Sequence, residues 1–521
     1  MSGSDTSPAF FMAKTMTGNS QVQQFLQEAM AHLQQNNLPE AMNRLEKVLE
    51  IEPDEFDALH ILGVLEHKQS QFDRAEELIR KAIAVNPNFP DAHYNLAKVL
   101  QDLSQQEDAI ASYQTALTLA PNMDVAHFNL GLIFSEQEKW QDAQNSFQQA
   151  LAINSNDPDY LFNLGNVYAQ LEQFDLAIDC YEKLVLRHPS QHIAFNNLGI
   201  AYRKRGQLEP AIAAYQQSIR LCPEYADAHF NLGNAFEETR QMQHASDSYQ
   251  KAIEHNPDMA EAYNNLGNVF YVLKDFDKAQ QAYEKTLTLQ PENAFSRHML
   301  NSLTGVASDT APTQYIEALF DKAAGDFEER LVQDLKYNSP EELKTELLKL
   351  LNPPPQFQST LDLGCGTGLS GESFRAMTES LAGVDIASKM VTLARQKKIY
   401  DTLQVSEIIR YLDQTSTQYD LFIAADVLAY IGNLEPLFAS LKKRCLQDAY
   451  FLFTVEETEQ EDYLLRKTGR FSHSKNYIQT LAKTHKFNIE TCTPTTIRME
   501  NDRPITGYNF ILRSSFCEGA K

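Results

Sequence analysis

A spacing of 34 residues recurs through the N-terminal part of the chain and constrains the fold more than any other feature. Prolines lie on one grid with this step, and only Ser155 interrupts it. The grid prolines are Pro53, Pro87, Pro121, Pro189, Pro223, Pro257 and Pro291. Because proline cannot continue a helix, a proline at a fixed interval predicts that one helix ends in every period.

Small and aromatic residues follow the same step. Glycine recurs at one position, where Ala97 substitutes once, and alanine and an aromatic ring recur at two others. These residues are Gly63, Gly131, Gly165, Gly199, Gly233 and Gly267; Ala41, Ala75, Ala109, Ala143, Ala177, Ala211, Ala245 and Ala279; and Tyr113, Phe147, Tyr181, Tyr215, Tyr249 and Tyr283. The pattern resembles the tetratricopeptide repeat, a pair of antiparallel helices. The resemblance implies an all-α tetratricopeptide superhelix over residues 22–304, about eight repeats and a capping helix.

A row of asparagines is expected on the concave face of this superhelix. Asn95, Asn129, Asn163, Asn197, Asn231 and Asn265 share the sixth position of their repeats. A carboxamide both donates and accepts hydrogen bonds, so the row could hold an extended peptide or protein segment whatever its side chains. It resembles the asparagine ladder in the repeats of O-GlcNAc transferases. Equally open is that each asparagine bonds within its own repeat.

The other segments divide the chain further. Residues 1–21 and 515–521 are expected to be loose tails, 305–312 has the composition of a linker, and 313–357 is expected to be a helical lead-in. Apolar residues recur there at helical spacing: Tyr315, Leu319, Phe320, Phe327, Leu331 and Leu335.

From residue 358 to 514, apolar runs alternate with helical segments, which predicts an α/β domain with a mainly parallel sheet. Seven strands are expected, and the last two should form a hairpin. They are residues 359–363, 381–386, 403–407, 419–425, 449–455, 488–492 and 506–513.

The stretch Leu361-Asp-Leu-Gly-Cys-Gly-Thr-Gly368 is read as a buried strand, a glycine-rich turn and the start of a helix. Glycines at alternate positions let the backbone turn sharply and approach a ligand closely. Leu369 stands where a dinucleotide fold has its third glycine, which argues against a dehydrogenase. With Asp362 ahead of the turn, the stretch resembles motif I of class I S-adenosylmethionine-dependent methyltransferases, which have a Rossmann-like sheet.

This resemblance implies a set of cofactor-binding residues. They are Asp362, Gly364, Cys365, Gly366, Thr367, Gly368, Asp385, Ile386, Glu407, Ile408 and Asp426. By resemblance, the glycine loop and Asp362 hold the methionine half of S-adenosylmethionine, and Asp385 binds the ribose. Glu407 stands near the adenine amino group, where the family more often has aspartate. Asp426 ends the fourth strand beside the transferred methyl group.

A hydroxyl or ammonium acceptor must lose a proton, so a general base is sought near the strand ends. The candidates are His473, Tyr430, Glu456 and Tyr477, of which His473 has an ordinary pKa in the useful range. Arg498 could pair with an acidic substrate group or with Glu500. Ala424-Ala-Asp-Val427 replaces the N-P-P-Y motif of amide and nucleobase-amine methylases.

Composition excludes several classes of protein. The net charge of −25 argues against nucleic acid as a partner. The six cysteines are scattered without a C-x-x-C pair, which argues against a disulfide framework or structural zinc and for a reducing, cytoplasmic location. No run approaches the roughly 18–20 apolar residues of a membrane span.

Segments such as Gly469-Arg-Phe-Ser-His-Ser474 resemble bacterial proteins that join tetratricopeptide repeats to a methyltransferase domain. The resemblance implies a methyltransferase whose repeats recruit a protein partner or substrate. The alternative is a non-catalytic adaptor with a vestigial or cofactor-sensing second domain. An O-GlcNAc-type glycosyltransferase would need a second α/β domain, for which the residues after the linker are too few.

Overall fold

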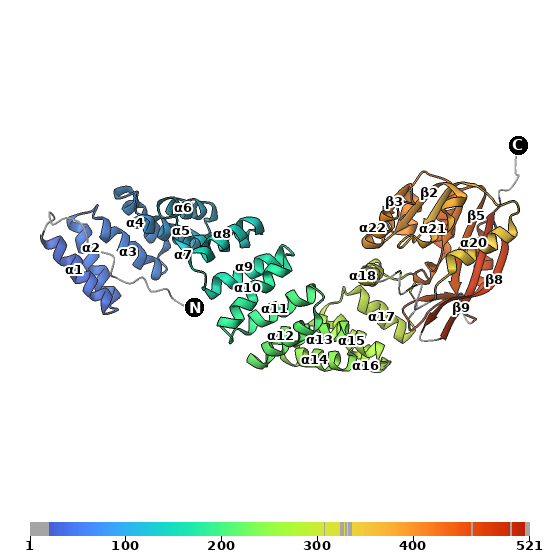
Figure 1. Ribbon diagram of the computed structural model, residues 1–521, viewed down its shortest axis with the longest axis horizontal. Coiled ribbons are helices and arrows are strands. Elements are labelled where there is room, and N and C mark those ends of the chain that lie inside the picture. Colours follow the sequence, from blue (N-terminus) through green and yellow to red (C-terminus); the bar gives the residue numbers. More distant parts are fainter. Residues whose placement is uncertain are drawn as a thin grey trace. The chain divides into compact units, whose positions relative to one another are not determined.

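The computed structural model describes residues 20–306, 308–323, 328, 331, 336–459, 462–500 and 503–515. The predictions for residues 1–19, for Phe327 and Leu335, and for the C-terminal tail after Ser515 lie outside these residues. The chain divides into two compact units, Met1–Gln241 and Met242–Lys521. The second unit therefore contains the last repeats together with the α/β domain (Figure 1).

The first unit is a succession of antiparallel helix pairs. Its helices are α1 (Ser20–Gln34), α2 (Leu38–Ile51), α3 (Phe56–Lys68), α4 (Phe72–Val85), α5 (Pro90–Asp102), α6 (Gln106–Leu119), α7 (Asp124–Glu136), α8 (Trp140–Ile153), α9 (Pro158–Gln170), α10 (Phe174–Arg187), α11 (His192–Lys204), α12 (Leu208–Leu221) and α13 (Ala226–Glu238). The 34-residue step thus corresponds to one helix pair, as predicted. α8 ends at Ile153 although Ser155 replaces the grid proline, so that proline is not required to end the helix.

Close packing inside each pair explains the recurrent glycines and aromatic rings. A Cβ atom on Gly131 would lie 2.5 Å from the Phe147 ring, and one on Gly165 would lie 2.7 Å from the Tyr181 ring. Both rings are almost completely buried. The ring therefore occupies the space that the missing side chain leaves, and a larger residue would force the two helices apart.

The second unit begins with the last repeats and the lead-in helices. These are α14 (Met242–His255), α15 (Ala260–Val272), α16 (Phe276–Leu289), α17 (Ala294–Thr304), α18 (Thr313–Ala323) and α20 (Ser339–Leu350). None of the helices in the described part of the chain combines the length and apolar character needed to cross a bilayer.

Seven strands form one sheet in the order β3-β2-β1-β4-β5-β9-β8. They are β1 (Phe357–Leu363), β2 (Thr378–Asp385), β3 (Thr402–Val405), β4 (Tyr419–Ala424), β5 (Cys445–Glu456), β8 (Phe487–Glu500) and β9 (Arg503–Ser514). β1 to β5 are parallel, and β9 runs antiparallel to both β5 and β8. The predicted seven-stranded fold with a final hairpin is confirmed. A second, two-stranded sheet of β6 (Tyr463–Leu465) and β7 (Phe471–His473) was not predicted.

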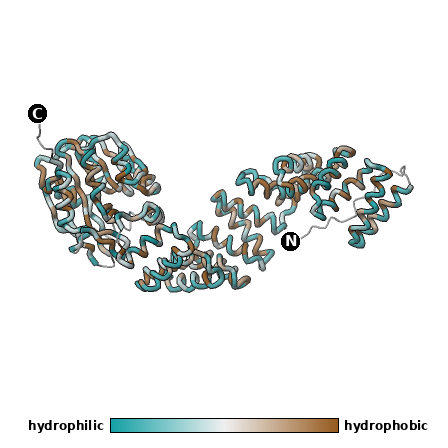
Figure 2. Tube along the Cα trace, turned by 180° about the vertical axis from the view of Figure 1, so that it is seen from behind, coloured by the Kyte–Doolittle hydropathy of each residue, from teal (hydrophilic) through white to brown (hydrophobic). Residues whose placement is uncertain are grey.

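Helices cover both faces of the large sheet. Phe422 faces the core formed with α23 (Ile408–Gln414), α24 (Glu435–Arg444) and α25 (Lys475–Thr484). Its neighbours Leu421 and Ile423 face the core formed with α20 and α21 (Leu369–Phe374). Successive residues of β4 therefore contact two different cores, so the strand is apolar along its length. Figure 2 shows hydrophobic and hydrophilic residues interleaved along the trace. The remaining elements are η3 (Arg375–Met377), α22 (Ser388–Gln396) and η4 (Leu428–Tyr430).

The segment with a linker's composition is fixed to the α/β domain. The Asp309 carbonyl accepts hydrogen bonds from the Gly432 and Asn433 amides, both at 2.8 Å. Thr310 forms an isolated bridge with Ile431, and the Ala311 amide donates to the Tyr430 carbonyl at 2.9 Å. Polar composition suggested a free connection, but the backbone of this segment supplies the hydrogen bonds of a short strand.

Candidate functional site

A cavity of about 810 Å³ opens at the carboxyl ends of β1, β2 and β4 and beyond β3. Ligands bind at this edge in open α/β sheets, where the strand order reverses between β1 and β4. Nine of the eleven predicted cofactor residues line it: Gly364, Cys365, Gly366, Thr367, Asp385, Ile386, Glu407, Ile408 and Asp426. Asp362 and Gly368 are not part of the lining.

The glycine loop depends on backbone conformations that other residues adopt with strain. Gly364, Gly366 and Gly368 have φ angles of 68°, 51° and 100°. A Cβ atom on Gly364 would lie 2.6 Å from Val427, whereas one on Gly366 would meet no atom within 4 Å. The loop is therefore packed at its first glycine and open at its second, where it borders the cavity.

Asp385 ties the loop to the next strand. Its Oδ2 accepts a hydrogen bond from the Gly366 amide at 2.8 Å, and its Oδ1 accepts one from the Ala387 amide at 2.9 Å. Asp385 also lines the cavity, so its carboxylate is within reach of a ligand there. The predicted ribose acid thus also sets the shape of the glycine loop.

Asp362 is fully buried beneath the loop. Its Oδ2 accepts a hydrogen bond from the Tyr400 hydroxyl at 2.6 Å, while its Oδ1 is buried without a hydrogen bond of good geometry. Burial raises the pKa of Asp362 from 3.8 to about 7, and the Tyr400 hydrogen bond opposes this rise. A buried carboxyl with one unpartnered oxygen is suited to accept a donor from a ligand, since such a donor would relieve the desolvation.

Tyr400 was missed by sequence reasoning, although its ring supports three glycines. A Cβ atom would lie 2.4 Å from it on Gly371, 2.9 Å on Gly383 and 3.2 Å on Gly368. No motif or spacing marks this tyrosine, because its contacts are made across more than 15 residues of sequence. The ring fills the space under the loop, and its hydroxyl reaches Asp362.

Glu407 has a structural role that the sequence did not predict. Its carboxylate caps α23, accepting hydrogen bonds from the Ile409 amide at 3.0 Å and the Arg410 amide at 2.7 Å. Glu407 still borders the cavity. Its oxygens are thus already engaged with the helix N-terminus, which stabilises the negative charge.

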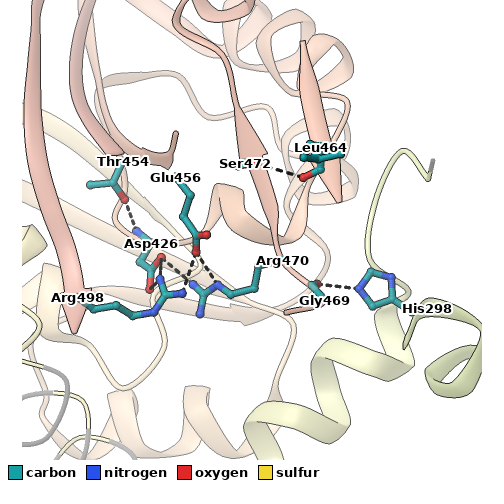
Figure 3. Close-up of polar contacts among 9 residues, drawn as sticks. All are labelled: His298, Asp426, Thr454, Glu456, Leu464, Gly469, Arg470, Ser472 and Arg498. Atoms are coloured by element: carbon teal, nitrogen blue, oxygen red, sulfur yellow. Dashed lines mark hydrogen bonds and ion pairs between the residues drawn. The ribbon is translucent and has the colours of Figure 1, made fainter. Parts of the chain in front are cut away.

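Asp426 belongs to a group of four charged residues at the edge of the cavity (Figure 3). Its Oδ1 lies 2.7 Å from Arg470 Nη2 and 3.3 Å from Arg498 Nη1. Glu456 Oε1 lies 2.8 Å from Arg498 Nη2 and 3.0 Å from Arg470 Nε. The structure thus pairs Arg498 with Asp426 and Glu456, two partners that the sequence did not predict, and two carboxylates balance the two guanidinium groups.

The predicted general bases are not brought together. Tyr430 lines the cavity, and burial raises its pKa. Glu456 lies behind the lining in the four-residue group just described. His473 is completely buried and donates from Nε2 to the Ile431 carbonyl at 2.8 Å, and burial lowers its pKa to about 4. Tyr477 bonds to the Leu434 amide and to Asn433.

His473 is thus a structural residue, and its prediction as a general base is wrong. The sequence segment that contains it was correctly singled out, but the residue of that segment at the cavity is Arg470. The position of a histidine near a strand end does not reveal whether its ring faces solvent or a backbone carbonyl.

The asparagine row contributes to packing between repeats. Asn95 Nδ2 lies 3.0 Å from His60 Nε2, and Asn129 donates to the Tyr94 hydroxyl at 3.3 Å; both partners belong to the preceding repeat. Asn163 instead bonds to the Asp159 carbonyl of its own helix at 2.8 Å. The remaining bonds run from Asn197 to Asn166, from Asn231 to Asn196 and from Asn265 to Tyr249. Five of the six amides therefore link consecutive repeats.

Family models match both parts of the chain. Models described as TPR repeat and tetratricopeptide repeat match residues 131–172 and 199–239, and 158–190, 226–259 and 260–293, respectively. A model described as methyltransferase domain matches residues 361–451. A model described as anaphase-promoting complex, cyclosome, subunit 3 matches residues 34–116.

Curated relatives match the α/β domain. The chain is 25% identical over 134 residues to a ubiquinone biosynthesis O-methyltransferase of Glaesserella parasuis, covering 22% of this chain and 57% of that protein. It is 25% identical over 126 residues to the mitochondrial ubiquinone biosynthesis O-methyltransferase of Rattus norvegicus, covering 22% and 36%. The chain thus spans between a third and just over half of the length of such relatives.

Among solved structures, the C-terminal part of a TPR repeat-containing protein from Cytophaga hutchinsonii is 20% identical, with a TM-score of 0.40, covering 47% of this chain and 98% of that one. The two groups of family models fall on different parts of the chain, which agrees with the helix pairs and with the mixed sheet. The chain is accordingly a fusion of tetratricopeptide repeats with a methyltransferase domain.

Proposed function

We propose that this chain transfers a methyl group from S-adenosylmethionine and that its repeats recruit a protein that is the acceptor or brings the acceptor. The observation that carries the proposal is the cradle formed by the open glycine at position 366, the two carboxylates Asp362 and Asp385, and the cavity in front of them. The adaptor alternative requires that this cradle bind no cofactor or bind it without turnover.

The residues present fit S-adenosylmethionine. Among the described residues, neither the buried Asp362 Oδ1 nor the buried Thr367 Oγ1 has a hydrogen bond of good geometry, and an ammonium group could satisfy such an acceptor. Asp385 lines the cavity, and a carboxylate is a suitable acceptor for ribose hydroxyls. A volume of 810 Å³ lies in the upper part of the roughly 300–1,000 Å³ range of ligand pockets, which supports a cofactor together with part of an acceptor.

When bound, S-adenosylmethionine would supply a methyl group on a sulfonium centre for in-line attack by a nucleophile. The chain's part is to position the reactants and exclude water. Ile316 and Phe320 of α18 also line the cavity, and they provide apolar surface there.

The described cavity residues favour an acceptor that needs little help in losing its proton. Asp426 is paired with two guanidinium groups, and burial raises the pKa of Tyr430. The Asp426 carboxylate is thus engaged by two cations, and the Tyr430 hydroxyl keeps its own proton near neutral pH. A thiol, carboxylate or acidic hydroxyl fits this environment better than a neutral alcohol.

Isothermal titration of the full chain with S-adenosylmethionine and S-adenosylhomocysteine tests the proposal. Micromolar binding is expected, with a loss of at least tenfold in Asp385→Asn. Asp420→Asn is the matched control, because Asp420 also accepts two backbone hydrogen bonds, from the Gln358 and Ser359 amides, but does not line the cavity. Absence of binding to the unaltered chain, or equal losses in both variants, would contradict the cradle as a cofactor site.

Transfer of labelled methyl groups in a cell lysate tests the second half of the proposal. A labelled protein product should disappear with Asp385→Asn. It should weaken in a chain carrying Asn129→Ala and Asn231→Ala, whose cofactor affinity is expected to be unchanged. Cofactor binding without any labelled product would favour the non-catalytic adaptor.

A further inference from the structure

The hairpin of β6 and β7, residues 463–473, lies between the last repeat and the cavity. Its turn, residues 466–470, is closed by hydrogen bonds from the Gly469 amide to the Arg466 carbonyl at 2.9 Å and from the Arg466 amide to the Arg470 carbonyl at 2.8 Å. Arg470 lines the cavity from this turn. The hairpin therefore has one side toward the site and another toward helices that belong to the repeats.

Helices α16 and α17 contact the turn directly. His298 of α17 is 2% exposed, and its Nε2 lies 2.8 Å from the Gly469 carbonyl oxygen (Figure 3). The Ser302 hydroxyl, one turn further along α17, lies 3.5 Å from the Lys467 carbonyl. The Lys467 ammonium lies 4.9 Å from the centre of the Phe276 ring of α16. Three residues of the last repeat and its capping helix thus contact two residues of the turn.

The turn has no room to shift toward these helices. Gly469 has a φ of 75°, and a Cβ atom there would lie 2.6 Å from the Tyr315 hydroxyl and 3.4 Å from Met299 Sδ. The His298 and Tyr315 rings are 4.4 Å apart, so α17 and α18 form one wall against Gly469. Because Arg470 follows Gly469 directly, this wall fixes where the Arg470 side chain begins.

On the cavity side, the same hairpin supports the loop that follows β4, residues 426–433. Arg470 Nη2 contacts Asp426 Oδ1 at 2.7 Å, and its guanidinium carbon lies 5.0 Å from the centre of the Tyr430 ring. His473, at the other end of the hairpin, donates to the Ile431 carbonyl. The loop after β4 is therefore held by two side chains of the hairpin, and the hairpin is held by the repeats.

We infer that His298 is a positioning residue for the methyltransferase site, acting through Gly469 and Arg470 on Asp426 and the loop after β4. By this inference, the last repeat and α17 are part of the structure that supports the site. A displacement of that repeat can therefore alter the cavity lining through the hairpin. Its effect on methyl transfer depends on the proposed function, whereas the mechanical coupling does not.

Hydrogen–deuterium exchange of the full chain, without ligand, tests the coupling. The Asp426 amide donates to Thr454 Oγ1 at 2.7 Å and the Tyr430 amide to the Val427 carbonyl at 3.1 Å, so both report on the loop. His298→Ala should speed exchange at both amides by about fivefold to tenfold, the effect expected for loss of one buried hydrogen bond. His298→Gln, which can still donate to the Gly469 carbonyl, should restore most of the protection.

His229→Ala is the matched control. His229 is also buried in a repeat helix, and its Nε2 contacts a backbone carbonyl, that of Pro223, at 2.9 Å. If His229→Ala speeds exchange at Asp426 and Tyr430 as much as His298→Ala does, the effect is general loosening and the inference fails.

Combining His298→Ala with Arg470→Met tests whether His298 acts on the loop through Arg470 or only by supporting the fold in general. In the Arg470→Met background His298→Ala should still speed exchange in residues 466–469 but add nothing at Asp426, because the connecting side chain is absent. Additive effects at Asp426, or no effect of His298→Ala on the loop in the unaltered background, would overturn the inference. If His298→Ala does not fold, replacement of the exposed Lys467 with alanine is the second test. This variant should speed exchange at the same two amides by about twofold. Unchanged exchange at those amides would count equally against the coupling.

The titration with S-adenosylmethionine distinguishes failure of this inference from failure of the proposed function. Failure of the unaltered chain to bind the cofactor would overturn the proposed function alone. Normal cofactor binding with an unresponsive loop would overturn the positioning role alone.

Discussion

The buried carboxyl of Asp362 makes the stability of the methyltransferase domain depend on pH, and the hydrogen bond from Tyr400 reduces this dependence. Burial holds the folded pKa of Asp362 at about 7, against 3.8 ordinarily. Between these values the folded state binds more protons than the unfolded state, so this residue's contribution to stability falls as pH rises from about 4 to about 7. At pH 5 Asp362 is protonated, and at pH 8 it is mostly ionised.

Replacing Tyr400 with phenylalanine removes a hydroxyl that lies 2.6 Å from Asp362 Oδ2. At pH 8 the lost bond has a charged acceptor and should cost about 1.5–3 kcal/mol. At pH 5 the acceptor is a neutral acid, and the cost should be about 0.5–1.5 kcal/mol. The difference of roughly 1–1.5 kcal/mol corresponds to a rise of about 1 in the pKa of Asp362.

The assay is urea unfolding at pH 5 and at pH 8. Hydrogen exchange in peptides that cover β1 assigns the unfolding transition to this domain. Tyr419→Phe is the control, because Tyr419 is also buried but its hydroxyl pairs at 2.8 Å with the Tyr411 hydroxyl and not with a carboxylate. Its cost should be the same at both. An equal cost of Tyr400→Phe at pH 5 and pH 8, or a larger cost at pH 5, would refute the reasoning.

Three further predictions concern the loop, a buried histidine and the repeats. Gly366→Ala should fold, since a Cβ atom there meets nothing within 4 Å, but should weaken S-adenosylmethionine binding in a titration more than tenfold; unchanged affinity would contradict the role of this open glycine. His473→Gln should flatten the loss of thermal stability between pH 6.5 and pH 4, because the lowered pKa of His473 makes the folded state bind fewer protons there than the unfolded state; a slope equal to that of the unaltered chain would count against it. Phe147→Ala should destabilise the repeats by about 3–5 kcal/mol in a denaturant titration, whereas exposed Leu186→Ala should cost less than about 0.5 kcal/mol.

Periodicity and strand–loop–helix order allowed the fold to be predicted, because both depend on contacts between residues close in sequence. The aromatic ring that meets Gly131 comes from the partner helix of the same repeat, Phe147, so the step along the chain reveals it. The parallel strands were located by their apolar runs, although β8 continues to Glu500, well beyond the predicted end at residue 492.

The site was predicted only where backbone conformation demands particular residues. Positive φ angles favour glycine at 364, 366 and 368, and this preference is visible in the sequence. Tyr400 and Arg470 contribute through side chains whose partners are 38 and 44 residues away, Asp362 and Asp426. No local pattern encodes such pairs. The short strands β6 and β7 were missed for the same reason, since a three-residue strand has no detectable alternation.

The junction between α17 and the hairpin has a consequence for how the length of the chain can vary. In a solenoid each repeat contacts its neighbours alone, so whole units can be gained or lost without rebuilding the rest. Here the C-terminal end of the repeats also contacts the methyltransferase domain, through the hydrogen bond between His298 and Gly469. Duplication or deletion of helix pairs ahead of α15 would leave the contacts of α16 and α17 with the hairpin in place, whereas deletion of the α15–α16 pair would remove the Phe276 ring that contacts Lys467. Descendants of such a chain are therefore expected to differ in the number of early units and to keep the last one.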